Sequence, residues 1–324
     1  MKKIVIIILA IMLVLSFTLV IAGCKGEENP TIGIIQYVEH VALDSAREGF
    51  VDALADNGYV DGENITIDVQ NAQADQSNLS TISDRFVADK VDLILAIATP
   101  AAQSIAGKTK DIPILGTAIT DYEAAKLVDS NEVPGGNVSG TTDMNPIKEQ
   151  IELLVKLVPD AQTIGVIYTS SEDNSIVQAQ IAREVIEEMG LTYTEVTITN
   201  SNDVQQAVQS IVEDCDALYL PTDNILASSM PVVAGVTIES KTPVICGESG
   251  MVAGGGLATL GINYYDLGYQ TGLMAVKILK GEAETATMAI ESATEFDYAI
   301  NGDIAEQIGL EIPADLTEFI IEAE

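Results

Sequence analysis

Tryptophan is absent from the 324 residues of this chain, and histidine, cysteine and basic side chains are scarce. One histidine, His40, and three cysteines without a Cys-x-x-Cys pair argue against a zinc site, so we expect no metal. The chain has 15 basic and 49 acidic residues, for a formal charge of −34. This balance argues against a nucleic-acid partner, because neutralising phosphates requires a basic face.

Sequence signatures of enzymes are missing as well. The chain has no Gly-x-Ser-x-Gly elbow, no phosphate-binding loop of the Walker type and no Gly-x-Gly-x-x-Gly after a predicted strand. The glycines at 254–256 precede a predicted strand, whereas a phosphate cradle precedes a helix. We therefore expect a protein that is not an enzyme and that carries no cofactor.

The cysteines leave one structural question open. Cys215 and Cys246 each lie beside or within a predicted strand. Buried free thiols are the favoured interpretation, and a disulfide between the two remains the alternative.

The amino-terminal segment carries an export signal. Lys2 and Lys3 precede an uninterrupted apolar run over residues 4–22, which predicts a signal peptide at 1–23, with a membrane-spanning anchor as the competing interpretation. The residues Ile21-Ala22-Gly23-Cys24 resemble a bacterial lipobox. That resemblance implies cleavage before Cys24, lipidation of its sulfur and a short tether at 24–30. The predicted location is extracytoplasmic, with a lipid anchor in the bacterial cell membrane.

From residue 31 onward, apolar strands alternate with amphipathic helices. The run at 93–97 is typical of a strand buried on both faces of a parallel sheet. The pattern predicts an α/β fold of two doubly wound parallel-sheet lobes with a ligand cleft between them. The first lobe is predicted at 31–143 plus 263–290 and the second at 144–262 plus 291–324. A single helix is expected at 225–239, and residues 251–256 are rich in glycine.

Two strand-to-helix junctions have a similar design. Thr99 and Pro100 follow the strand at 93–97 as a predicted N-cap and first helical residue. Asp223 and Asn224 follow a second apolar strand and precede a second helix. Free N–H groups at such helix starts favour a carboxylate or a phosphate. Ordinary βα turns, which every doubly wound sheet contains, are the alternative interpretation.

Polar residues follow most of the predicted strands. Ligands of open parallel sheets bind outside the carboxyl ends of the strands, so these residues are candidates for a site that accepts a zwitterion. Asp121, Asp223, Glu172 and Glu248 are candidate partners for an ammonium group, and Tyr37, Tyr122 or Tyr264 for a flat apolar wall. Asp223 and Asn174 are also explained as N-caps, and Asp121 as the start of a turn. The candidate ligand-binding set is Gln36, Tyr37, Thr99, Pro100, Ala101, Thr120, Asp121, Asn174, Ser175, Thr222, Asp223, Asn224 and Glu248.

Several longer stretches resemble a known family over essentially the whole mature chain. The most specific are Gln36-Tyr37-Val38-Glu39-His40, Asn71-Ala72-Gln73, Ala98-Thr99-Pro100-Ala101-Ala102-Gln103, Pro134-Gly135-Gly136-Asn137, Ser171-Glu172-Asp173-Asn174-Ser175, Pro221-Thr222-Asp223-Asn224 and Asn263-Tyr264-Tyr265-Asp266. Together they resemble the substrate-binding lipoproteins of ABC importers of the tryptophan/tyrosine type. Tyr122 departs from the family pattern, which usually has Pro after the Asp.

That resemblance implies a type I periplasmic-binding-protein fold whose two lobes close on an aromatic or other apolar amino acid. It also implies a membrane permease as partner and a monomeric protein. On this basis Thr99, Ala101 and Ser175 are assigned to the ligand carboxylate and Asp223 to its ammonium group. The general cleft residues are Gln36, Tyr37, Thr120, Asn174, Asn224 and Glu248.

Three alternatives remain open at this point. A nucleoside-binding lipoprotein would share the fold, although a purine calls for stacked rings and aromatic residues are few. A ligand sensor would dock on a membrane receptor in place of a permease. An exported hydrolase is disfavoured by the missing nucleophile and metal sets.

Overall fold

The computed structural model describes residues 29–321. The predicted signal peptide at 1–23 and the predicted lipidation of Cys24 lie outside the described residues. A compact unit begins at Thr31, after a separate amino-terminal segment that ends at Pro30. No helix formed by residues 29–321 has the length and apolar character needed to cross a membrane.

The first sheet has six parallel strands in the order β11-β5-β4-β3-β1-β2. Because β1 and β3 are central, their side chains are almost entirely buried, which explains their near-continuous apolar sequence. The strands are β1 (Thr31–Gln36), β2 (Thr66–Asn71), β3 (Leu93–Ile97), β4 (Ile114–Ile119), β5 (Val138–Thr142) and β11 (Glu291–Ser292).

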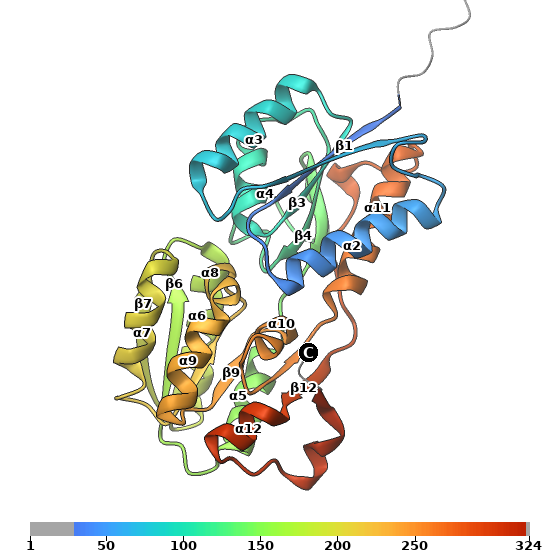
Figure 1. Cartoon of the computed structure of the whole chain (residues 1–324). Helices are drawn as coiled ribbons and strands as arrows, with labels where there is room; N and C mark the ends of the chain where they lie inside the picture. Colours follow the sequence, from blue (N-terminus) through green and yellow to red (C-terminus); the bar gives the residue numbers. More distant parts are fainter. Residues whose placement is uncertain (1–28, 322–324) are drawn as a thin grey trace, which may run out of the picture. The chain divides into compact units, whose positions relative to one another are not determined.

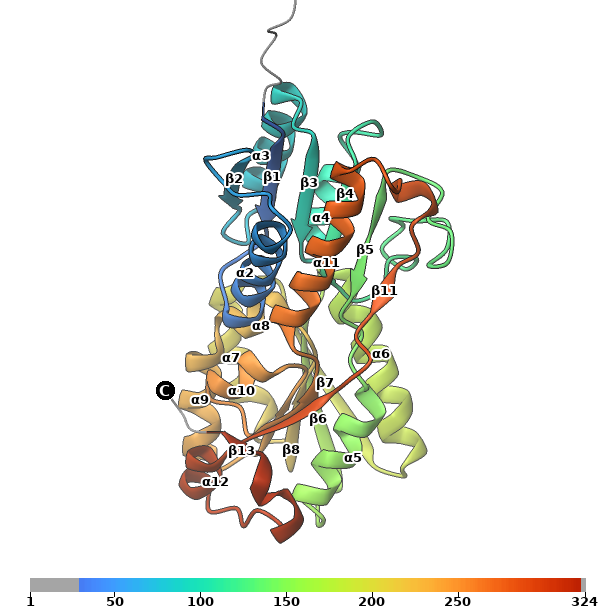
Figure 2. The ribbon, with the colours of Figure 1, turned by 90° about the vertical axis from the view of Figure 1, so that its right-hand side faces the viewer.

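Helices cover both faces of this sheet, as Figures 1 and 2 show. On one face α2 (Val41–Asp56) packs along α11 (Tyr264–Leu279), and on the other lie α3 (Gln76–Asp89) and α4 (Thr99–Ala106). We call this sheet and these four helices the first lobe.

Two glycines set the approach of α2 to α11. A Cβ atom on Gly49 would lie 2.0 Å from the backbone oxygen of Tyr265, and one on Gly268 would lie 1.9 Å from that of Ala46. Both distances are far below van der Waals contact, so neither position accepts a side chain. The returning segment α11 is thereby held directly against the first helix of the lobe.

The second sheet has seven strands in the order β13-β12-β10-β9-β8-β6-β7. Its strand pairs are parallel, as predicted for this lobe, except that β10 pairs with β12 in the antiparallel direction. The strands are β6 (Thr163–Thr169), β7 (Thr192–Ile198), β8 (Ala217–Leu220), β9 (Val244–Cys246), β10 (Ala258–Gly261), β12 (Asp297–Asn301) and β13 (Ile320–Ile321).

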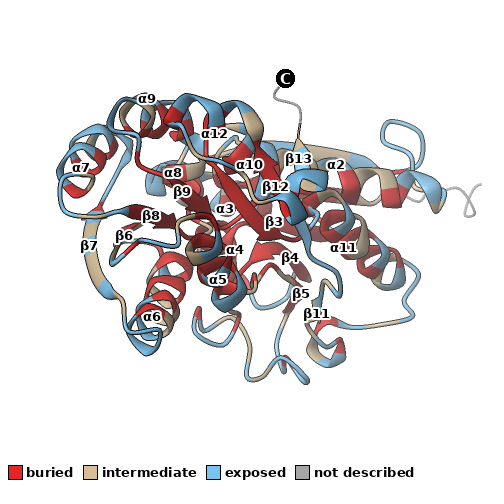
Figure 3. Cartoon of the chain, turned by 90° about the horizontal axis from the view of Figure 1, so that it is seen from below, coloured by how far each residue is buried: buried red, intermediate tan, exposed pale blue. Residues whose placement is uncertain are grey.

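With its helices this sheet forms the second lobe. The helices are α5 (Ile147–Leu157), α6 (Asp173–Glu188), α7 (Val204–Ile211), α8 (Asn224–Ser228), α9 (Met230–Ser240), α10 (Ser249–Ala253) and α12 (Gly302–Ile308). The 3₁₀ turns are Ser201–Asp203, Thr285–Thr287 and Ala314–Phe319. In Figure 3 the strands of both sheets are largely buried, while the helices present exposed outer faces.

The chain passes between the lobes from β5 to α5, from β10 to α11 and from β11 to β12. Because Glu291 and Ser292 pair with β5, the last crossing comes after residue 292, two residues later than predicted. Figure 2 shows β11 beside β5, with the chain continuing from there toward the second sheet.

Two local expectations need correction. The segment 225–239 forms two helices, α8 and α9, because Ser229 leaves helical geometry (φ −112°, ψ 9°) and Pro231 follows in the first turn of α9. Helix α4 begins at Thr99, so its N-cap is Ala98.

The glycine-rich stretch at 251–256 includes part of the short helix α10, which Glu248 caps. Cys215 and Cys246 are free thiols, the favoured of the two interpretations.

Candidate functional site

Polar strand ends of the two lobes meet around one small cavity. Its free volume is about 10 Å³, room for roughly one water molecule, so a larger ligand requires the lining to move apart. The lining residues are His40, Leu43, Ala118, Thr120, Asp143, Asn174, Thr222, Asp223, Asn224, Ala227, Glu248 and Tyr264. We refer to this region as the cleft.

Direct contacts join the lobes beside the cleft. Gln103 of α4 donates its side-chain N–H to Asp173 at the start of α6, with an N···O distance of 2.8 Å. Gln178 of α6 donates to the hydroxyl of Thr120 at 3.4 Å. The described arrangement is therefore a closed one, held by polar contacts that can be exchanged for water when the lobes separate.

Buried carboxyl groups give the cleft its electrostatic character. Asp143, Glu172, Asp223 and Glu248 are each at most 2 % exposed. Burial raises the pKa of Glu172 to about 8, with the nearby Asp223 as the second cause, and burial raises the pKa of Glu248 to about 7. No Lys or Arg occurs among the described residues of the lining. The site is thus acidic and short of hydrogen-bond donors.

Three of these carboxyl groups are already occupied by hydrogen bonds. Asp223 caps α8 through the amide of Leu226 and also accepts the amide and the hydroxyl of Thr169, at 2.6 and 2.9 Å. Glu248 caps α10 through the amides of Gly250 and Met251. Asp143 accepts the hydroxyls of Thr120 and Tyr264. These bonds hold the loops that follow β8, β9 and β5.

Glu172 is different. Its Oε2 accepts the side-chain N–H groups of Asn224 at 2.5 Å and Asn174 at 3.3 Å. Its Oε1 is buried and has no hydrogen-bond partner. A buried carboxylate oxygen without a donor is costly, because desolvation is not compensated.

The buried side-chain N and O atoms without a partner are confined to one end of the parallel strands. Within residues 29–321 they are His40 Nδ1, Thr99 Oγ1, Glu172 Oε1 and Asn174 Oδ1. His40 follows β1, Thr99 follows β3, and Glu172 and Asn174 follow β6, each after the carboxyl end of its strand. Unpaired buried polar atoms are rare in folded proteins, so their concentration here marks a place built for a polar ligand.

Backbone strain occurs at the same place. Ala98, between β3 and α4, has φ 81° and ψ 152°, and Ala118, near the end of β4, has φ 55°. Non-glycine residues in such conformations cost on the order of 1–3 kcal/mol each and cluster at functional sites. The strain at Ala98 sets the direction in which α4 starts.

Comparison with known proteins agrees with this architecture. The family described as ABC transporter substrate binding protein matches residues 31–321. The chain belongs to this family. A curated relative from Clostridioides difficile, named tyrosine-binding protein, is 44 % identical over 91 % of this chain and 86 % of its own length. A second relative, an uncharacterised protein of Rickettsia prowazekii, is 26 % identical over 82 % of each chain.

Two solved structures bear on the conformation of this substrate-binding protein. A Streptococcus pneumoniae ABC domain in complex with L-Trp is 39 % identical, with a TM-score of 0.87, and the match covers 91 % of this chain and 100 % of the other. A ligand-free, open substrate-binding protein from Clostridium difficile is 48 % identical over the same coverage, with a TM-score of 0.69. The described arrangement thus resembles the L-Trp complex more than the open structure, despite the lower sequence identity.

The structure brings part of the sequence-predicted set into the lining of the cleft. Ser175, 0 % exposed, lies behind this lining and hydrogen-bonds to Asp223. Tyr37 of the first lobe lies near Glu172 and Asp223, which, after burial, contribute to raising the pKa of its phenol. The members that line the cleft are Thr120, Asn174, Thr222, Asp223, Asn224 and Glu248.

The start of α4 lies outside this lining. Thr99, Pro100 and Ala101 are buried there, and the amide of Ala101 already donates to the oxygen of Ala98 at 3.1 Å. The unpartnered group at this helix start is therefore the Thr99 hydroxyl.

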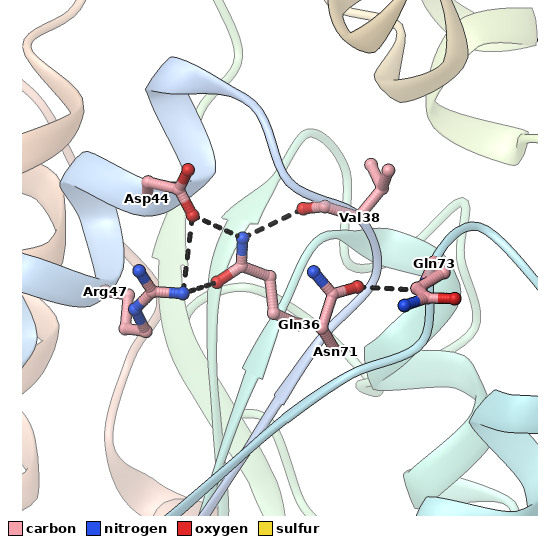
Figure 4. Close-up of polar contacts among 6 residues, drawn as sticks. All are labelled: Gln36, Val38, Asp44, Arg47, Asn71 and Gln73. Carbon is pink, nitrogen blue, oxygen red and sulfur yellow. Dashed lines mark hydrogen bonds and ion pairs between the residues drawn. The ribbon is translucent and has the colours of Figure 1, made fainter.

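Gln36 serves the interior of the first lobe. Its side-chain N–H group donates to Asp44 and to the oxygen of Val38, and its Oε1 accepts from Arg47 at 2.7 Å (Figure 4). With both ends of its amide occupied, Gln36 fixes the loop between β1 and α2. Figure 4 also shows Asn71, which accepts the amide of Gln73 in the neighbouring loop.

Two further candidates have structural roles in the described arrangement. Asp121 accepts the amides of Glu123 and Ala124, which is the turn-forming role considered for it. Tyr122 is fully buried, and its hydroxyl donates to the oxygen of Thr141 within the first lobe. Tyr122 is therefore not among the residues that line the cleft, whereas Tyr264 is.

Sequence reasoning missed several lining residues: His40, Leu43, Ala118, Asp143 and Ala227. Asp143 follows β5 directly, so the rule that polar residues gather at strand ends predicts it. The apolar members carry no such signal, because an alanine or leucine beside a strand is indistinguishable from core.

Proposed function

We propose that this protein is the extracytoplasmic substrate-binding component of an ABC importer and captures an aromatic L-amino acid between its two lobes. One observation carries the proposal: the unpartnered buried polar atoms gather at the carboxyl ends of β1, β3 and β6, and two of them belong to His40 and Asn174, which line the interlobe cleft. The proteins named as tyrosine-binding and as a complex with L-Trp support the choice of ligand class.

The ammonium group is assigned to Glu172 and Asn174. Glu172 Oε1 and Asn174 Oδ1 are both unpaired acceptors, and the two side chains are in contact. An ammonium group supplies three N–H donors, and its positive charge favours the ionised form of Glu172 over the protonated form that burial favours. Asp223 was the residue expected in this role, but its oxygens already receive donors from Thr169 and Leu226. We therefore favour Glu172, with Asp223 holding the loop beside it.

The carboxylate is assigned to the start of α4. The Thr99 hydroxyl is a buried donor without a partner, and the positive end of a helix dipole favours an anion. Ala101 and Ser175, the other predicted carboxylate ligands, already use their polar groups elsewhere. The ligand side chain would lie among Leu43, Ala118, Ala227 and Tyr264.

Delivery and anchoring complete the proposal. Substrate-binding proteins of ABC transporters work outside the cytoplasm, and the closed form would dock on a membrane permease. The lipobox-like residues before Cys24 would attach the chain to the membrane. Incorporation of labelled fatty acid in the expressing bacterium should be lost in Cys24→Ser; equal labelling of this variant would refute the anchor without affecting the ligand assignment.

The ligand assignment is tested by a thermal-shift comparison of three compounds. L-Trp carries both charged groups, N-acetyl-L-tryptophan lacks the ammonium group and tryptamine lacks the carboxylate. Ligand at 100 times its Kd stabilises the native state by about 2.7 kcal/mol, a readily measured shift. We expect a shift with L-Trp, none with N-acetyl-L-tryptophan and a weaker one with tryptamine at the same concentration. Equal shifts with all three, or none, would overturn the proposal.

A further inference from the structure

His40 is the only histidine of the chain and lines the cleft from the first lobe. It lies immediately before α2, and its side chain makes no capping hydrogen bond to that helix. Its Nε2 lies 3.5 Å from the side-chain oxygen of Asn224, which belongs to the second lobe. The residue is half-buried, while its Nδ1 is fully buried and has no partner.

The contact with Asn224 determines which nitrogen of the His40 ring carries the proton. Asn224 donates its side-chain N–H to Glu172, so its oxygen is the group that faces His40. An amide oxygen only accepts, and the proton of the neutral imidazole is therefore on Nε2. Nδ1 is left as an acceptor with no donor. Burial lowers the pKa of His40 to about 4, which keeps the ring neutral at physiological pH.

Asn224 separates two unpaired acceptors. Its oxygen faces His40 and its N–H group binds Glu172, so His40 Nδ1 and Glu172 Oε1 belong to groups on the two sides of one amide. A ligand that satisfies both needs two separated donors. A tyrosine has an ammonium group and a phenol O–H, and a tryptophan has an ammonium group and an indole N–H. A phenylalanine has only the ammonium group.

We propose that His40 Nδ1 accepts a hydrogen bond from the side-chain donor of the ligand and thereby selects tyrosine and tryptophan over phenylalanine. This inference rests on the proposed amino-acid function and makes it more specific. A site built to hydrogen-bond a donor discriminates against the analogue that lacks it, because its own buried acceptor is then left unpaired.

The test is calorimetric titration of the whole protein with L-Tyr, L-Trp and L-Phe. Two variants are matched: His40→Gln places an amide nitrogen near Nε2 and removes the Nδ1 acceptor, whereas His40→Asn places an oxygen near Nδ1. We expect the wild type to bind L-Tyr and L-Trp at least about tenfold more tightly than L-Phe. His40→Gln should lose that preference, because its affinity for L-Tyr and L-Trp falls about tenfold more than its affinity for L-Phe, and His40→Asn should retain part of it.

The outcomes separate the two proposals. Equal wild-type affinity for L-Phe and L-Tyr would overturn the role of His40 and leave the amino-acid function standing. A uniform loss for all three ligands in His40→Gln would also overturn it, because His40 would then act only as a contact between the lobes. Absence of binding of all three ligands to the wild type would overturn the proposed function itself.

Discussion

Glu172 differs from the other buried carboxyl groups around the cleft at the level of a single atom. Asp143, Asp223 and Glu248 have donors on both oxygens, whereas Glu172 Oε1 has none. Sequence patterns predicted that acidic residues would follow the strands, but not which of them would be used up in capping. An N-cap and a ligand contact call for the same residue types at the same helix start.

Replacement of Glu172 by Gln tests the ammonium assignment. Loss of a buried charged partner should weaken binding of an aromatic amino acid by about 2 kcal/mol or more, roughly 30-fold in Kd. Calorimetric titration measures the change. Asp121→Asn is the control, because Asp121 is a turn-forming carboxylate outside the lining, and its affinity should equal that of the wild type. An unchanged Kd in Glu172→Gln would remove this residue from the site.

Replacement of Asp223, unlike that of Glu172, should affect stability more than ligand binding. Asn is also a good N-cap, so Asp223→Asn should keep α8 in place and bind the ligand within about threefold of the wild type. Asp223→Ala loses the cap and leaves the buried Thr169 donors unpaired, which should lower the free energy of unfolding by about 2 kcal/mol. Denaturant unfolding and titration of both variants measure these effects. A loss of affinity in Asp223→Asn as large as in Glu172→Gln would restore Asp223 as the ammonium partner.

The sequence was most informative about the positions of the helices and strands. Hydrophobic periodicity located most strands of both sheets and most helices, because buried parallel strands and amphipathic helices leave clear patterns. The two-residue strands β11 and β13 are too short to leave one. It did not locate the break at Ser229, where both flanking segments are helical, or the antiparallel pairing of β12, which depends on how the chain returns across the sheet. It also missed that Gln36, at the end of β1, turns back into its own lobe.

The close packing of α2 against α11 predicts the effect of a glycine substitution on stability. Gly268→Ala should lower the free energy of unfolding by about 2 kcal/mol, because its Cβ would meet backbone of α2 rather than a flexible side chain. Gly235→Ala is the matched control: Gly235 is an exposed residue of α9 with nothing within 4 Å of its added Cβ, and the change should stabilise by about 1 kcal/mol. Denaturant unfolding of both variants would contradict this account if the two changes had the same sign.

At the scale of the whole molecule, the account describes lobes that separate and close. Each lobe has its own sheet and its own flanking helices, and three crossings of the chain join them. Hydrogen bonds cross the cleft, such as that of Gln103 with Asp173, and apolar residues of both lobes belong to one hydrophobic cluster. The two-lobe architecture followed from the alternation of strands and helices, whereas the closed arrangement did not, because it depends on contacts between segments far apart in the sequence.

Closure without ligand should depend on pH. In the closed arrangement burial raises the pKa of Glu172 to about 8. We expect closing to contribute to this burial, so that closing takes up a proton at Glu172 and is favoured at lower pH. In the closed arrangement burial lowers the pKa of His40 from 6.5 to about 4. Below pH 6.5 closing therefore requires His40 to release a proton, and this opposes closing. Lowering the pH from 8 to 6.5 should therefore increase the closed fraction of the ligand-free protein.

Small-angle X-ray scattering measures this effect as a decrease in the radius of gyration. Glu172→Gln cannot take up the proton and should show little of the change. A radius of gyration that is constant from pH 8 to 6.5 in the ligand-free wild type, while added ligand still decreases it, would contradict the proton linkage.

Calorimetric titration of the purified protein with L-tyrosine and L-tryptophan, beside adenosine, tests the central claim most directly. The account predicts saturable binding of one aromatic amino acid per chain and no heat with adenosine, because Tyr264 is the one ring among the described lining residues besides His40 and a purine would lack a second stacking partner. Binding of adenosine with no response to either amino acid would keep the fold and the family but contradict the ligand and the roles assigned to Glu172 and Thr99.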